Sequence, residues 1–131
     1  MTAEVLRRKT RTVMVGNVGV GSDQPIRIQS MLTSETTDLN SVMREIKALD
    51  QVHCEMIRIT IPNRKALETI PEVRRIMSEE GIQRPLIADI HFNPLLAIDS
   101  CEYFEKVRIN PGNYADRKKF EIREYSDQQY V

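Results

Sequence analysis

The stretch Leu86-Ile87-Ala88-Asp89-Ile90-His91-Phe92 decides the fold that we expect for this chain. It follows Pro85 and begins as an apolar run, which is typical of a strand buried on both faces of a sheet. Successive side chains of a strand point to opposite faces, so Asp89 and His91 share one face. A carboxylate and an imidazole are costly to bury without partners, and polar groups at the ends of apolar parallel strands are typical of functional sites.

Polar residues occupy matching positions on two further predicted strands. The strand expected over residues 56–61 carries Arg58, and the strand expected over residues 106–110 carries Arg108 and Asn110 on one face. If these strands lie side by side and parallel, their polar ends meet at one edge of the sheet. Two arginines at that edge indicate an anionic ligand, because the planar guanidinium group matches the geometry of phosphate or carboxylate.

A fourth segment, residues 26–31, offers Gln29 and Ser30 near its end, on opposite faces. For any single residue of this kind, membership of a buried ion pair or a hydrogen-bonded core is the simpler interpretation. The repetition at strand ends favours a site for the set as a whole. That set is Arg58, Asp89, His91, Arg108 and Asn110.

The composition fits one soluble globular domain or a piece of a larger one. Of the 131 residues, 40% are hydrophobic and 29% are charged, with 19 basic and 19 acidic side chains. Zero net charge argues against a nucleic-acid or membrane surface, because both normally attract a basic excess. No apolar run approaches the ~20 residues of a membrane helix, and the first residues lack a signal-peptide core, so we expect a cytoplasmic protein.

The two cysteines predict no metal site. Cys54 and Cys101 form no Cys-x-x-Cys pair, and neither has a histidine at ligand spacing. Each follows closely on a predicted helix or lies near its end, so we expect two buried free thiols.

A short hairpin is predicted near the start of the chain. Residues 12–15 have the pattern of a short strand and lead into a turn at Gly16 and Asn17, after which a second short strand follows. The glycines that come next do not form a dinucleotide-binding loop, because a strand follows them in place of a helix. We expect the hairpin to close the bottom of a barrel.

Amphipathic segments between the strands predict helices. Apolar residues recur at three-and-four spacing over residues 39–49, with Thr37 or Asp38 as cap, and a third helix starts at Asn93-Pro94 and runs to about Tyr103.

The second predicted helix has its apolar stripe over residues 67–77. Pro71 is expected to kink or restart it, since proline lacks the N–H that a helix interior uses. Gly81 suits its C-terminal end.

Strands and helices therefore alternate, which predicts an α/β fold: the N-terminal part, about four strand-helix units, of a (β/α)8 TIM barrel preceded by a short β-hairpin. A whole barrel takes ~250 residues, so residues 1–131 are expected to be part of a TIM-barrel substrate-binding domain, with the rest of the barrel outside this chain. Two alternatives stay open, a complete four-strand α/β sandwich and a half-barrel that dimerises.

Six motifs, in order, resemble the 4-hydroxy-3-methylbut-2-enyl diphosphate synthase family over about residues 9–113. They are Lys9-Thr10-Arg11-Thr12-Val13, Ile28-Gln29-Ser30-Met31, Thr36-Thr37-Asp38, Ile57-Arg58-Ile59-Thr60-Ile61-Pro62, Ala88-Asp89-Ile90-His91-Phe92 and Val107-Arg108-Ile109-Asn110-Pro111-Gly112-Asn113. The resemblance implies an oxidoreductase of isoprenoid biosynthesis, in the MEP pathway. Its barrel would bind 2-C-methyl-D-erythritol 2,4-cyclodiphosphate, and a 4Fe-4S cluster would supply electrons for reductive ring opening.

The resemblance also implies roles for individual residues. Arg58 and Arg108 match diphosphate contacts. Asp89 and His91 match catalytic groups that orient a substrate hydroxyl or help proton delivery, and Asn110 is a further substrate-facing group. Gln29 and Ser30 match further substrate-binding positions.

The family's cluster is held by three cysteines and a glutamate of a C-terminal iron–sulfur domain, and this chain has no such set, so we expect it to be inactive alone. Implied partners are the cyclic diphosphate, a ferredoxin or flavodoxin type reductant and a second copy of the full-length protein, with no nucleic acid or membrane. Residues 114–117 resemble the longer, insert-containing form of the enzyme. A non-redox pyrophosphate-binding barrel enzyme of the dihydropteroate synthase kind and an inactive binding fragment stay open as alternatives.

Overall fold

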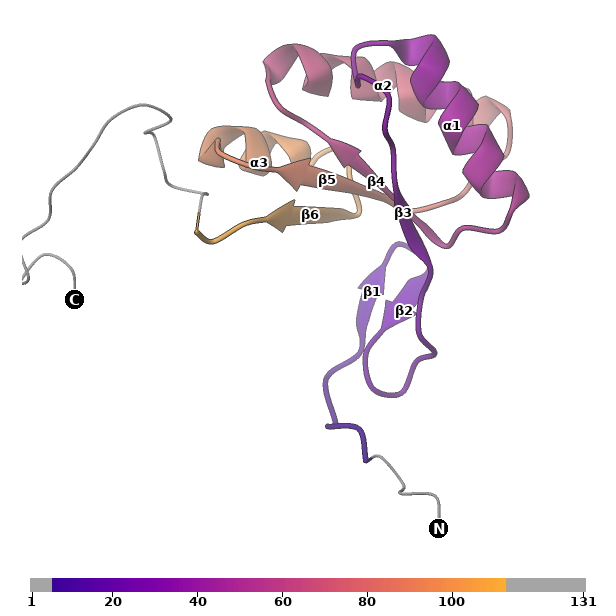
Figure 1. The fold of residues 1–131 in the computed structure, drawn as a ribbon, viewed down its shortest axis with the longest axis vertical. Helices are drawn as coiled ribbons and strands as arrows, with labels where there is room; N and C mark the ends of the chain where they lie inside the picture. Colours follow the sequence, from indigo (N-terminus) through magenta and orange to yellow (C-terminus); the bar gives the residue numbers. More distant parts are fainter. Residues whose placement is uncertain (1–5, 113–131) are drawn as a thin grey trace, which may run out of the picture.

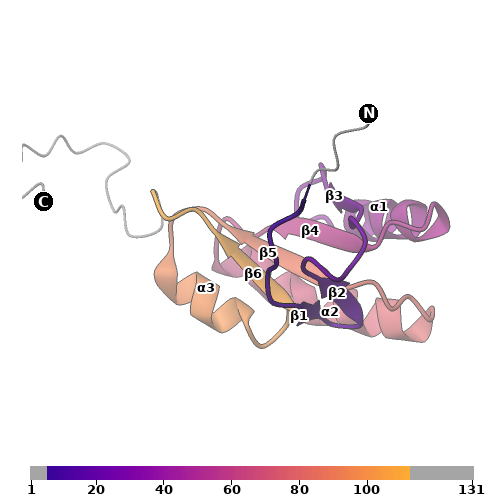
Figure 2. The same ribbon diagram turned by 90° about the horizontal axis from the view of Figure 1, so that it is seen from below.

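Four parallel strands and three helices form the body of the molecule in a computed structural model, which describes residues 6–112 (Figure 1). The strands are β3 (Gln29–Met31), β4 (Met56–Thr60), β5 (Leu86–Ile90) and β6 (Lys106–Ile109). They pair in the order β3-β4-β5-β6, each parallel to its neighbour (Figure 2). The predicted alternation of strand and helix is confirmed. Residues 114–117, which resemble the longer form of the enzyme, lie outside the described residues.

The helices are α1 (Leu39–Gln51), α2 (Arg64–Glu79) and α3 (Pro94–Ser100). The N-cap side chains of α1 and α3, Asp38 and Asn93, each accept backbone N–H groups of the first turn, as the sequence predicted. Gly81, with φ of +70°, ends α2 together with a hydrogen bond from the Ile82 N–H to the Met77 carbonyl. Capping therefore sets the helix boundaries.

Two expectations concern how the helices continue and end. Pro71 was expected to kink or restart the second helix; it does not restart it, because α2 runs continuously through it, and a kink stays a prediction. The third helix ends at Ser100, three residues before the expected end at Tyr103. The N–H groups of Cys101, Glu102 and Tyr103 bond three residues back in place of four, so the chain tightens into turns before β6.

The two faces of the sheet differ in what covers them. One face packs against the helices through an apolar core that includes Ile57, Ile59 and Ile90. On the other face, Val15 and Val18 of the hairpin pack against Met56 and Ile87, near the amino ends of β4 and β5. Figure 1 shows α1 and α2 above the sheet and the hairpin below it. The carboxyl half of this second face is therefore left for polar side chains.

The predicted hairpin is confirmed as β1 (Val13–Val15) and β2 (Val18–Val20), which pair antiparallel. Gly16 takes a φ of +59° at its tip, in the left-handed region that glycine tolerates. Arg27 ties the hairpin to the sheet, since its Nε donates to the Gly19 carbonyl at 2.8 Å and its Nη1 donates to Glu55 at 2.8 Å.

The two cysteines differ in their exposure to solvent. Cys54 is a buried free thiol, as predicted, but Cys101 is exposed. Because α3 ends at Ser100, Cys101 falls in the turn that follows and leaves the buried stripe of that helix. Within residues 6–112, no helix has both the length and the apolar character required to cross a bilayer.

Candidate functional site

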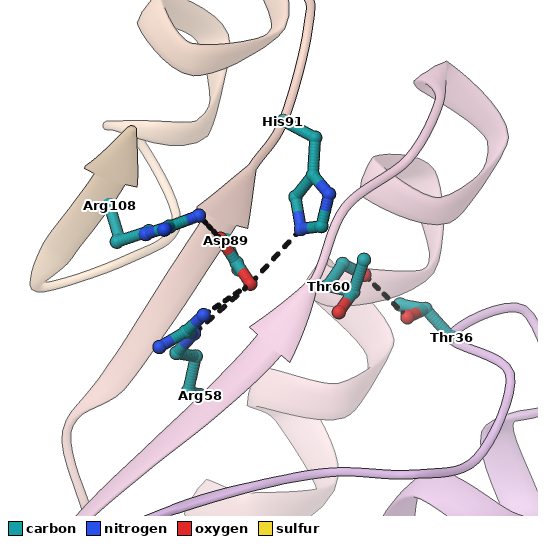
Figure 3. Close-up of polar contacts among 6 residues, drawn as sticks. All are labelled: Thr36, Arg58, Thr60, Asp89, His91 and Arg108. Atoms are coloured by element: carbon teal, nitrogen blue, oxygen red, sulfur yellow. Dashed lines mark hydrogen bonds and ion pairs between the residues drawn. The ribbon is translucent and has the colours of Figure 1, made fainter. Parts of the chain in front are cut away.

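Asp89 is the centre of a charged cluster at the carboxyl end of the sheet (Figure 3). Its side chain is fully buried, and Oδ2 accepts hydrogen bonds from Arg58 Nε at 3.0 Å and Nη2 at 2.8 Å. Oδ1 accepts from Arg108 Nη1 at 3.0 Å. His91 Nε2 lies 3.2 Å from Oδ2. Four of the five residues selected from the sequence are thus brought together.

Strand register explains how the cluster forms. Asp89 of β5 is paired with Arg108 of β6 and with Thr60 of β4, and Arg58 lies two residues before Thr60. Paired residues of neighbouring parallel strands point to the same face, as do residues two apart on one strand. The intervening Ile59 and Ile90 point into the helix-covered core. Alternation therefore directs both arginines to the carboxylate from opposite sides.

The cluster keeps a net positive charge and unused donors. Two guanidinium groups surround one carboxylate, and the Arg58 and Arg108 side chains remain 26% and 36% exposed. Their bonds to Asp89 use Nε and Nη2 of Arg58 and Nη1 of Arg108. The remaining N–H groups have no partner among residues 6–112, so they can donate to the oxygens of an anion.

His91 stands at the open side of the cluster. Its side chain is 44% exposed, and its ring meets that of Phe92 edge to face. Beside it is a cavity of about 110 Å³ that Thr60 and Asn93 also line. His91 therefore couples the buried carboxylate to the surface where a ligand would approach.

Three predicted site residues make no hydrogen bond with the cluster within the described part of the chain. Asn110 Oδ1 accepts the N–H of Gly112 at 3.0 Å, within its own turn. Gln29 pairs with Met56 and is exposed toward the hairpin end of the sheet. Ser30 is paired with Ile57, so it faces the helices. Their predicted substrate contacts stay predictions.

The loop between β3 and α1 contributes contacts that the sequence did not single out. The Leu32 N–H donates to the Arg58 carbonyl at 2.9 Å, and the buried Thr36 Oγ1 donates to the Thr60 carbonyl at 2.6 Å (Figure 3). The run of hydroxyls over residues 33–37 was a signal for this loop, but it did not show which hydroxyl is buried.

The pKa of Asp89 reflects two opposing effects. Burial acts to raise it, but hydrogen bonds from Arg58, His91 and Arg108 and the charge of Arg58 outweigh burial. The net result is a pKa below the ordinary value for an aspartate. Asp89 is therefore ionised at neutral pH and holds both arginines.

The stabilisation by Asp89 should be lost in acid. Because the folded state lowers its pKa below the unfolded value of about 3.9, the contribution is complete well above about pH 4 and declines as the pH falls through the folded pKa. We expect the difference in free energy of unfolding between the unmodified protein and Asp89→Asn, measured with urea, to shrink as the pH is lowered. A difference that stays constant into acid would contradict this assignment.

A 4Fe-4S cluster does not fit the described residues. No three His, Cys, Asp or Glu side chains of residues 6–112 form a group able to hold a metal ion. Cys54 is buried with its Sγ donating to the Met56 carbonyl at 3.2 Å, whereas Cys101 is exposed after α3. Residues 6–112 therefore supply no ligand set for such a cluster.

The sequence model of the GcpE TIM-barrel domain matches residues 10–128. The chain belongs to this family. The predicted fold class, part of a TIM barrel, is thereby confirmed, and the alternative of a self-contained four-strand sandwich is not supported. In TIM barrels the active site lies at the carboxyl ends of the strands, and the Asp89 cluster lies at that end of the sheet in this chain.

Curated relatives of this GcpE-family chain share one enzyme name. A 4-hydroxy-3-methylbut-2-en-1-yl diphosphate synthase (flavodoxin) of Leptospira interrogans is 48% identical over 95% of this chain and 19% of its own length. That of Akkermansia muciniphila is 50% identical over 95% of this chain and 21% of its own. A chloroplastic rice enzyme, named with ferredoxin, is 45% identical over 97% of this chain and 17% of its own. The chain thus spans about a fifth of the length of these relatives.

Proposed function

We propose that this chain is the substrate-binding barrel part of a 4-hydroxy-3-methylbut-2-enyl diphosphate synthase. The complete protein would reductively open 2-C-methyl-D-erythritol 2,4-cyclodiphosphate to the linear allylic diphosphate, with loss of water. The observation that carries the proposal is the pair Arg58 and Arg108, held by buried Asp89 at the carboxyl edge of the sheet. The enzyme name of the relatives supports the proposed diphosphate product.

Arg58 and Arg108 are the proposed diphosphate ligands. Asp89 fixes one side of each guanidinium group, so their remaining N–H groups are oriented before the substrate arrives. A fixed arginine loses less side-chain entropy on binding than a mobile one. This arrangement favours an oxygen-rich anion over a neutral ligand.

His91 and Asp89 are the proposed groups that orient a substrate hydroxyl and hold a proton. The imidazole is within 3.2 Å of the carboxylate and partly exposed, so it can exchange protons with the site while Asp89 orients the ring. Asn110, Gln29 and Ser30 remain proposed substrate contacts that would require the bound ligand or further parts of the barrel.

The remaining parts of the proposal lie beyond residues 1–131. The iron–sulfur cluster would be held by ligands outside this chain, in a separate C-terminal domain, and would pass the two electrons of the reduction from an external reductant to the substrate. The names of the relatives carry flavodoxin or ferredoxin, which supports a small redox protein as the reductant. A homodimer of the complete protein and a cytoplasmic location complete the proposal, and gel filtration and cell fractionation test them.

Replacing Arg58 or Arg108 by Ala in the complete protein should weaken binding of the cyclic diphosphate about tenfold or more, since each loses a charge-assisted contact. Replacement by Lys should restore binding only in part, because the planar fork is lost. Calorimetric titration with the cyclodiphosphate measures the effect.

The matched control is Arg75→Ala. Arg75 is an exposed arginine that pairs with Glu72 and Glu79 on the surface of α2, so its loss should leave affinity unchanged. Unchanged affinity in properly folded Arg58→Ala and Arg108→Ala proteins would refute the assignment.

A further inference from the structure

Glu45 of α1 contacts a loop that borders the charged cluster. We call residues 32–38, between β3 and α1, the β3–α1 loop. Glu45 Oε2 accepts the Thr33 N–H at 2.9 Å, and Oε1 accepts the Ser34 N–H at 2.6 Å. The Thr33 hydroxyl adds a third contact at 3.3 Å to Oε2. One carboxylate therefore satisfies two consecutive backbone donors that have no strand partner.

The same loop is attached to β4 on both sides of these contacts. Before them, the Leu32 N–H bonds to the Arg58 carbonyl at 2.9 Å, and after them Thr36 Oγ1 bonds to the Thr60 carbonyl at 2.6 Å. Arg58 belongs to the cluster, and Thr60 is the register partner of Asp89. Figure 3 shows the Thr36–Thr60 contact beside the Asp89 cluster. A shift of the loop would therefore disturb the backbone of β4 next to Arg58 and Asp89.

Glu45 is ionised in this setting. Burial acts to raise its pKa, but hydrogen bonds from Ser34 and Thr33 outweigh burial and lower it below the ordinary value. Hydrogen bonds to a charged acceptor are stronger than neutral ones, so the carboxylate is well suited to fix the loop.

We propose that Glu45 is a positioning residue that holds the β3–α1 loop as a wall of the anion site beside Arg58. The inference rests on the proposed function, because the wall matters for a ligand of the Asp89 cluster. Glu45 itself does not touch the substrate in this proposal. It acts through the backbone of Thr33 and Ser34, and Thr33 is an exposed residue of this loop.

The direct test is Glu45→Gln in the complete, cluster-containing protein. Glutamine has one acceptor oxygen where the carboxylate has two, so one of the two backbone N–H groups loses its partner. We expect KM for the cyclodiphosphate to rise about tenfold with kcat nearly unchanged, because a binding wall is loosened and no reacting group is removed. Thr36→Val removes the hydrogen bond from the loop to the Thr60 carbonyl and should give the same pattern, which keeps the test decisive if Glu45→Gln fails to fold.

The matched control is Glu55→Gln. Glu55 also binds a backbone N–H, that of Ile28 at 3.0 Å, and an arginine, Arg27 at 2.8 Å, but at the amino end of the sheet. It should lower Tm as Glu45→Gln does and leave KM unchanged. Amide hydrogen exchange in residues 32–38 should speed up in Glu45→Gln and Thr36→Val and stay unchanged in Glu55→Gln.

Arg58→Ala, measured alongside, separates the two levels of the proposal. One outcome is that KM rises in Arg58→Ala but equals that of the unmodified protein in both Glu45→Gln and Thr36→Val. This outcome overturns the role of Glu45 and leaves the proposed function standing. Absence of cyclodiphosphate turnover in the unmodified complete protein overturns both. If Glu45→Gln lowers Tm but leaves KM unchanged, the carboxylate is purely structural, and the positioning role is overturned.

Discussion

Asp89→Asn is expected to lower the free energy of unfolding at neutral pH by about 3 kcal/mol, near the lower end of the cost of breaking a buried ion pair. Asp89 is fully buried and serves two arginines and a histidine with its two oxygens. Asparagine keeps the shape but has one acceptor and an N–H₂ group, which would face a guanidinium group. The arginines are partly exposed, and that exposure limits the cost.

Asp99→Asn is the matched control for this variant. Asp99 of α3 forms a surface ion pair with Arg64 of α2, and the Asp99 side chain is 44% exposed. Exposed pairs contribute about 0 to 1 kcal/mol, so this variant should unfold almost as the unmodified protein does. Equal urea midpoints for the two variants would show that the Asp89 cluster adds no more stability than a surface pair.

Asp89→Asn should also reduce turnover of the complete protein by more than its loss of folded fraction. Without the charge, Arg58 and Arg108 are no longer held in one orientation, and His91 loses the partner that orients its ring. His91→Ala removes the imidazole and leaves the arginine contacts, so it should reduce turnover with little change in Tm. Parallel losses of turnover and folding in both variants would assign the cluster to the core alone.

The sequence was sufficient to predict the cluster because two simple regularities act together. Alternation places Asp89 and His91 on one face, and parallel neighbours bring Arg58 and Arg108 to that face from either side. The apolar residues between them have no other place than the helix-covered core. Neither step depends on details of side-chain packing.

Other features depend on contacts that alternation does not determine. Asn110 has the parity of Arg108, but its side chain bonds within its own turn to Gly112. In the sequence Glu45 is an ordinary polar position of an amphipathic helix, and its proposed role depends on a contact with Ser34, 11 residues earlier in the chain. The exposure of Cys101 depends on where α3 ends, and helix ends are set by local hydrogen bonding that the apolar stripe does not reveal.

The 131-residue chain alone is expected to show no reductive turnover of the cyclodiphosphate. Its sequence holds two cysteines, and a 4Fe-4S cluster is typically held by four ligands. Cys54 is buried and donates to the carbonyl of Met56, whereas Cys101 is exposed after α3. The two thiols therefore cannot serve as half of such a ligand set unless the chain refolds. Weak affinity for the diphosphate should persist, because Arg58, Asp89 and Arg108 are all present.

The test is to purify the chain anaerobically with iron and sulfide and to assay cyclodiphosphate reduction with an artificial reductant, using the complete protein as the positive control. In the described residues, β3 and β6 each pair on one side, and Met31 and Ile109 on these outer strands are 40% and 39% exposed. The isolated chain should therefore self-associate through these edges, which light scattering detects. Turnover above the protein-free background would show that the 131 residues bind a competent redox centre, and would overturn the assignment of the reductive chemistry to residues outside this chain.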